Sequence, residues 1–212
     1  MPPDMDWAFI VSAFAAIFVV VNPISKVIIF PSLTQGYTKE ERVQTISVAI
    51  LASFLVFVTF GIFGRFIFEA LNVDYNALRF TGALVMLIVG LDLIQGKMAR
   101  TKPSPEETKE VEEKKMVGIF PLAIPFISGP AGIITVMLYL AEAPGIIEGT
   151  MVLVTCAVVC IITMLLLLES PLIYERIGSV GIKASGRLMG MIILAIGFQM
   201  LMNAVAIFLR AL

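Results

Sequence analysis

Asn22 and Pro23 interrupt a long apolar segment near the start of the chain and are residues that could bind a ligand. Asn is a strong N-cap, and Pro is favoured in the first turn of a helix. We therefore predict that one helix ends near Val21 and that a second helix begins at Pro23. The apolar stretches on either side place Asn22 near the middle of a membrane-spanning segment at 1.5 Å per residue.

A second break of the same kind lies at Ser128, Gly129 and Pro130, again inside an apolar segment. Either Ser128 or Gly129 can cap a helix that begins at Pro130. Proline kinks are common in membrane helices and are the structural alternative for either break alone. Breaks at matching depth in two segments favour a binding site, because unpaired backbone in hydrocarbon costs several kcal/mol per group.

The backbone groups freed at both breaks suit a molecule that carries a carboxylate and an ammonium group. Helices that begin there present free N–H groups and a positive dipole end to an anion. Helices that end there offer carbonyls, beside the side-chain oxygen of Asn22, to an ammonium group. Fixed charge is scarce nearby, so we predict a neutral α-amino acid as the ligand. The predicted substrate-binding residues are Val20, Val21, Asn22, Pro23, Ile24, Ser25, Phe126, Ile127, Ser128, Gly129, Pro130, Ala131, Gly132 and Gln199.

The elements that must position these residues are membrane-spanning helices. Of the 212 residues, 59% are apolar and only 15% are charged, which exceeds what one soluble core of this size can bury. The absence of His removes most zinc sites and His-dependent catalysis, so we expect no enzyme and no cofactor. The expected spans are Trp7 to Thr38, Val43 to Gly64, Phe80 to Gly96, Met116 to Ala141, Gly149 to Leu168 and Leu188 to Leu209.

Charge between the spans predicts how the chain crosses the cell membrane. Most of the 15 Lys and Arg residues fall between spans 1 and 2, 3 and 4, or 5 and 6. The positive-inside rule then places the 97–117 linker in the cytoplasm and both termini outside. A net charge of −1 without a basic stripe argues against nucleic-acid binding.

The chain also contains a weak internal repeat. When Asn22 is aligned with Gly129, Gly90 aligns with Gly197 and Asp92 with Gln199. Three spans per copy would invert the second copy relative to the first, as in many secondary transporters. We therefore predict an all-α polytopic membrane protein with six transmembrane helices in two inverted three-helix repeats, residues 1–96 and 118–212, joined by the 97–117 linker.

Two ionisable residues inside the spans are candidates for ion coupling. Asp92 interrupts the third span and Lys26 follows the first break. Ionisable groups in spans are functional candidates by default, so Asp92 could carry a coupling proton. A structural Lys26–Asp92 pair, or snorkelling of both side chains to the interface, is the alternative. Gln199 is open to two readings, a ligand contact or a hydrogen bond between helices.

The sequence resembles the MarC family of membrane proteins, which includes archaeal small neutral amino acid transporters. The resemblance covers nearly the whole chain. It rests on Asn22-Pro23, Arg79-Phe80-Thr81-Gly82, Pro121-Leu122-Ala123-Ile124-Pro125, Ser128-Gly129-Pro130, Arg187-Leu188-Met189-Gly190, Gly197-Phe198-Gln199 and Asn203.

The resemblance implies uptake of glycine, alanine and similar amino acids, driven by a gradient of H⁺ or Na⁺. The alternative is an exporter or passive facilitator of another small solute on the same fold. The expected partners are thus the amino acid, the ion and the lipid bilayer, and the sequence leaves the oligomeric state open.

Overall fold

The protein is a bundle of helices in the computed structural model, which describes residues 6–34, 36–70, 72, 75–96, 122–123 and 127–210. This part of the chain contains no strand. Five of its helical segments are long and apolar enough to cross a membrane, and the shorter helix Pro130–Glu142 is apolar as well. The predicted all-α polytopic class is confirmed. The helices are α1 (Trp7–Val21), α2 (Pro23–Leu33), α3 (Lys39–Ala70), α4 (Tyr75–Ile94), α6 (Pro130–Glu142), α7 (Ile146–Leu168) and α8 (Ser170–Arg210).

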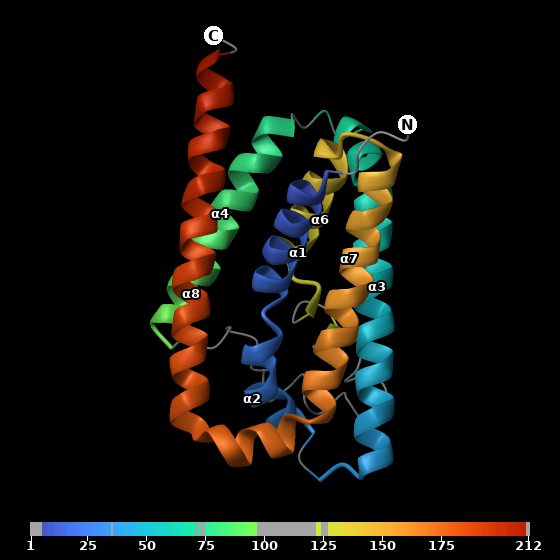
Figure 1. Ribbon diagram of the computed structural model, residues 1–212, viewed down its shortest axis with the longest axis vertical. Helices are drawn as coiled ribbons and strands as arrows, with labels where there is room; N and C mark the ends of the chain where they lie inside the picture. Colours follow the sequence, from blue (N-terminus) through green and yellow to red (C-terminus); the bar gives the residue numbers. More distant parts are fainter. Residues whose placement is uncertain are drawn as a thin grey trace.

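Successive spans run in alternating directions (Figure 1). The start of α1 and the end of α8 lie at one end of the bundle, which we call the terminal end. The α2–α3 connection lies at the opposite end, toward which α4 runs from the terminal end without reaching it. As a result α1 and α2 descend from the terminal end whereas α6 rises toward it, the opposite course expected of an inverted copy.

The first break has the predicted geometry. α1 ends at Val21 and α2 begins at Pro23. Between them Asn22 adopts the left-handed conformation, with φ 49° and ψ 63°. Its backbone N–H donates to the Phe18 carbonyl at 2.9 Å, and its Oδ1 accepts from the Ser25 N–H at 3.4 Å. A short polar side chain that can bond locally tolerates this conformation, which explains an Asn at the break.

The second break also follows the prediction. α6 begins at Pro130, with Gly129 as an N-cap that supplies no side-chain hydrogen bond. Just before it, the Ser128 hydroxyl and N–H both donate to the Ala123 carbonyl at 2.9 Å. Of the two candidate caps, Gly129 therefore takes the position. The Ser128 side chain bonds instead to the preceding segment.

The connection between spans 5 and 6 differs from the expected loop. Only Glu169 separates the end of α7 from the start of α8, and α8 bends at Gly178, where φ is 69°. Figure 1 shows its first part crossing the opposite end of the bundle before α8 turns along the other helices. Arg176, Lys183 and Arg187 therefore sit on a helix. Glycine permits the sharp bend because it has no Cβ to oppose a positive φ.

Contacts between α4 and α8 follow the internal repeat. A Cβ on Gly90 would lie 2.8 Å from Leu194 Cγ, and a Cβ on Gly197 would lie 3.2 Å from Leu87 Cγ. The alignment of the two halves exchanges Gly90 with Gly197 and Leu87 with Leu194. The two contacts are thus copies of each other, as an axis relating the halves would produce. The exact division into 1–96, 97–117 and 118–212 stays a prediction, because the linker lies outside the described residues.

Gly190 should tolerate substitution far less well than its neighbour Gly186 on α8. A Cβ on Gly190 would lie 2.9 Å from the Gly90 carbonyl oxygen, whereas one on Gly186 would meet only Ser25 Oγ, at 3.7 Å. Gly190→Ala should therefore separate α4 from α8 at a cost of about 1–3 kcal/mol. Thermal melts in detergent should show a clear drop for Gly190→Ala and little change for Gly186→Ala. Equal melting temperatures for the two variants would contradict this packing.

Candidate functional site

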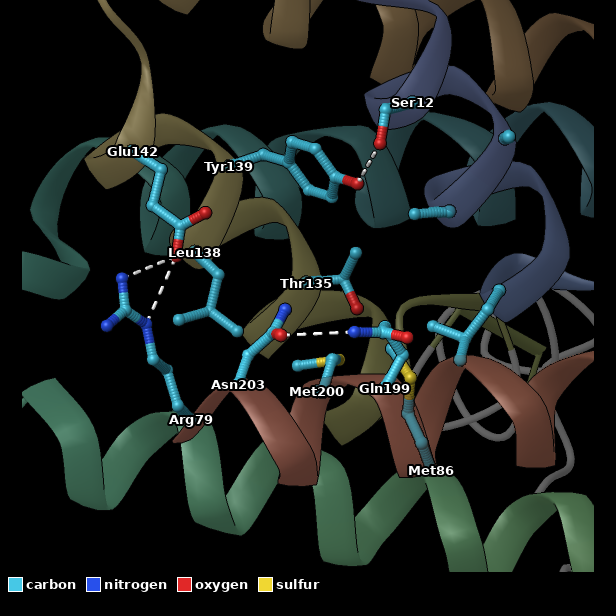
Figure 2. Close-up of a pocket in the computed structure, with 13 residues that line it drawn as sticks. Ser12, Arg79, Met86, Thr135, Leu138, Tyr139, Glu142, Gln199, Met200 and Asn203 are labelled. Carbon is cyan, nitrogen blue, oxygen red and sulfur yellow. Dashed lines mark hydrogen bonds and ion pairs between the residues drawn. The ribbon is translucent and has the colours of Figure 1, made fainter. Parts of the chain in front are cut away.

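A cavity of about 390 Å³ lies between α1, α4, α6 and α8 (Figure 2). It adjoins a second cavity of about 310 Å³ that reaches Arg210, at the terminal end. The two share Arg79, Glu142 and Asn203. The larger cavity is lined by Ser12, Ala15, Ala16, Arg79, Met86, Thr135, Leu138, Tyr139, Glu142, Ile196, Gln199, Met200 and Asn203.

Uncharged polar side chains from three helices converge on this cavity (Figure 2). Ser12 Oγ and the Tyr139 hydroxyl are 2.7 Å apart and share a hydrogen bond between α1 and α6. Gln199 Nε2 donates to Asn203 Oδ1 at 3.1 Å along α8. Thr135 Oγ1 donates to the Ala131 carbonyl at 2.7 Å. The cavity thus offers amide and hydroxyl groups that can donate to or accept from a small polar molecule.

Helical periodicity places these groups on the cavity. Thr135, Tyr139 and Glu142 follow one another at spacings of four and three along α6, and Gln199 and Asn203 are four apart on α8. Such spacings align side chains on one face of a helix. A stripe of polar residues at these spacings in an otherwise apolar helix is the sequence feature that could have indicated the cavity residues. Sequence reasoning missed Ser12, Thr135, Tyr139 and Glu142 as site residues, and met Arg79 and Asn203 only in the family motifs.

An ion pair stands where the two cavities meet. Arg79 Nη2 lies 2.7 Å from Glu142 Oε1, and Arg79 Nε donates to the same oxygen at 3.1 Å. The Arg79 side chain is 20% exposed and that of Glu142 is 45% exposed. Solvent therefore reaches both groups, so the pair contributes little stability and its members can exchange partners.

The deep end of the cavity rests on an apolar group that we call the central cluster. Met86, Ala131 and Ile193 are buried there, and Val19, Val20, Val85, Val89, Leu93, Ile196 and Met200 pack against them. Met86, Ile196 and Met200 also line the cavity. Val20 and Ala131, two of the predicted site residues, thus lie in the layer on which the cavity ends.

The remaining residues of the two breaks do not belong to the central cluster. Val21 and Ile127 share the main core cluster with Phe30 and Phe57. None of the predicted break residues lines the cavity, and Gln199 is the predicted site residue that does. Their role in binding stays a prediction. Asn22, Pro23, Ser128 and Gly132 are buried, Ile24, Ser25 and Gly129 are half-buried, Pro130 is exposed, and Phe126 lies outside the described residues.

Lys26 changes the expected chemistry of the first break. Its side chain is buried, and its ammonium group donates to the Val21 carbonyl. A cation is stabilised at the end of a helix, where the dipole is negative. The protein therefore places its own ammonium group where we expected that of a ligand. The Asn22 oxygen is likewise engaged, because it caps the Ser25 N–H.

Asp92 lies half-buried on α4. Within the described ranges no ion pair joins it to Lys26, so the structural pair considered from the sequence is not formed. The two residues are therefore separate candidates. Lys26 belongs to the break, and Asp92 lies on α4.

Comparison with known proteins gives one consistent group. Residues 7–209 match the family described as MarC family integral membrane protein. A UPF0056 membrane protein of Methanocaldococcus jannaschii is 30% identical over 197 residues, which cover 93% of this chain and 86% of that protein. The UPF0056 membrane protein YvbG of Bacillus subtilis is 34% identical over 198 residues, covering 93% and 94%. A Pyrococcus horikoshii relative with the same description is 32% identical over 193 residues, covering 91% and 92%. No solved structure matches.

Proposed function

We propose that this chain, which belongs to the MarC family of integral membrane proteins, is a secondary transporter of small neutral amino acids. The family description and the names of the relatives give membrane location without a substrate. The observation that carries the proposal is the cavity, with its uncharged polar lining and an ion pair at its mouth.

The chemistry of the cavity suits a zwitterion. Its volume of about 390 Å³ falls in the range of small-molecule sites. Arg79 and the two amide NH₂ groups can donate to a carboxylate, and Glu142 and the hydroxyl and amide oxygens can accept from an ammonium group. Deeper than the ion pair, the lining residues carry no charge. A charged substrate side chain would lose its hydration there without gaining a partner, which favours neutral amino acids.

The central cluster lies at the deep end of the cavity, and repacking of this layer is the transport step in the proposal. Substrate bound in the cavity would next reach the layer that holds Val20 and Ala131, between the two breaks. There α6 begins at Pro130 without a side-chain cap, so its first N–H groups could receive the carboxylate. Movement past this layer would then require the central cluster to repack. A gradient of H⁺ or Na⁺ would drive the cycle.

Uptake by purified protein in liposomes tests the function. Labelled alanine and glycine should accumulate above their outside concentration under an imposed pH or Na⁺ gradient, and an ionophore that collapses the gradient should abolish accumulation. Empty liposomes give the background. Equilibration without accumulation would indicate a passive facilitator instead. Failure of all twenty amino acids to bind the detergent-solubilised protein would reject the substrate class.

The same proposal includes an orientation, with the terminal end outside the cell and the 97–117 linker in the cytoplasm. Its basis is the concentration of Lys and Arg in alternate connections. Gly145 lies exposed between α6 and α7. Gly145→Cys should react with an impermeant maleimide in intact cells, whereas Ser104→Cys should not, in a background without Cys156 and Cys160. The reverse pattern would overturn the orientation.

A further inference from the structure

The central cluster is symmetric under exchange of the two halves. The alignment that pairs Asn22 with Gly129 also pairs Met86 with Ile193, Val89 with Ile196, and Leu93 with Met200. All these residues belong to the cluster. The layer that ends the cavity is therefore built from equivalent positions of both halves.

The lining of the cavity, in contrast, does not include the repeat partners of several of its residues. Gln199 lines it, whereas its repeat partner Asp92 does not. Ala16 lines it, whereas its partner Ala123 is completely buried. Arg79 stands at its mouth, and Arg187, its partner one residue out of register, lies on α8 beyond the other side of the cluster.

Contacts at the two ends of the α4–α8 interface differ. Toward the opposite end the backbones meet closely, since a Cβ on Gly190 would lie 2.9 Å from Leu93 Cβ. Toward the terminal end, Gly82 is the counterpart of Gly190 one residue out of register, and a Cβ on Gly82 would lie 2.6 Å from Ile134 Cγ2 of α6 and 3.3 Å from the end of the long Met200 side chain of α8. Within the described residues, the α4–α8 interface is therefore in backbone contact toward the opposite end, and near Gly82 it includes side chains that line the cavity.

We propose that Asp92 and Arg187 line a second binding cavity, open to the opposite end, that forms when the described cavity closes. This inference rests on the proposed transport function. The second cavity is bounded by Val89, Asp92 and Leu93 of α4 and by Arg187 and Ile193 of α8. Asp92 takes the place that Gln199 holds in the described cavity, and Arg187 takes the place of Arg79.

The two residues that replace Gln199 and Arg79 in the second cavity determine which ligand it can bind. The Asp92 carboxylate accepts from the ammonium group of an amino acid, and the Arg187 guanidinium donates to its carboxylate. The Arg187 guanidinium already points to this region, because its Nη2 lies 4.0 Å from the position of a Cβ on Gly96, four residues after Asp92. The second cavity therefore holds a carboxylate where the first holds an amide, and it binds the same zwitterion with a different group.

Side-specific labelling of single cysteines tests the second cavity in a background without Cys156 and Cys160. The test positions are Val89→Cys and Asp92→Cys, matched by their repeat partners Ile196→Cys and Gln199→Cys. Leu91→Cys and Phe198→Cys are controls, because both residues are exposed neighbours that do not line the described cavity. An impermeant thiol reagent is added to one face of oriented proteoliposomes at a time.

The proposal expects reagent at the opposite face to modify positions 89 and 92, and reagent at the terminal face to modify positions 196 and 199. Alanine at about ten times its dissociation constant should slow modification of Val89→Cys, which keeps the Asp92 carboxylate, about tenfold. The second cavity would be rejected if positions 89 and 92 reacted only from the terminal face, or not at all, while positions 196 and 199 reacted as expected. If each pair of positions reacted from its expected face but no amino acid slowed the reaction, the second cavity would be supported and the substrate class would be rejected.

Discussion

Replacing both amides of the cavity, in the double variant Gln199→Leu with Asn203→Leu, is expected to abolish substrate binding and uptake. The two side chains bond to each other along α8, where both line the cavity, and their remaining donors and acceptors are available to a ligand. Each hydrogen bond to a charged group contributes about 1.5–3 kcal/mol. Loss of both should weaken binding by more than about 100-fold, since 1.4 kcal/mol corresponds to a factor of ten.

Two neighbours on α8 provide the matched control for this variant. Phe198 and Met202 are 55% and 57% exposed and do not line the cavity. The double variant Phe198→Leu with Met202→Leu should bind and transport alanine like the unmodified protein. Binding titrations in detergent and uptake into liposomes measure both variants. Wild-type affinity in the amide variant, with a normal melting temperature, would show that the substrate binds elsewhere.

Asp92→Asn is expected to uncouple transport from the proton gradient. The change keeps the shape of the side chain but removes a carboxyl group that can take up and release a proton. The variant should still exchange labelled alanine between two loaded sides, because an amide oxygen can accept from the ammonium group as that of Gln199 does in the proposed site. Accumulation under a pH gradient should fall to the level of passive equilibration. Asp92→Glu, which keeps the carboxyl group, should retain part of the accumulation.

The variant Lys26→Met is expected to lower the stability of the folded protein more than Asp92→Asn does. Removal of the ammonium group leaves the buried Val21 carbonyl without this donor, at a cost of about 1–3 kcal/mol. Thermal melts should therefore show a lower melting temperature for Lys26→Met than for Asp92→Asn. Normal accumulation by Asp92→Asn would end its role as proton carrier, and coupling would then depend on another ion such as Na⁺.

The sequence alone determined the features that depend on a few adjacent residues. The breaks at Asn22 and Gly129 follow from capping by Asn and Gly and from the fixed φ of the prolines that come next. Membrane-spanning length follows in the same way from uninterrupted apolar composition. These effects act over one or two helical turns, so no knowledge of the packing was needed to predict them.

Only the tertiary structure decided which polar groups share a cavity and which are already paired. Ser12 and Tyr139 are far apart in the chain and meet because α1 packs against α6. Lys26 could have paired with Asp92, but its ammonium group reaches the Val21 carbonyl at the negative end of α1 instead. Such outcomes depend on how closely helices approach, as the glycines between α4 and α8 permit. That approach arises from side chains distant in sequence, and local rules for capping and span length contain no information about it.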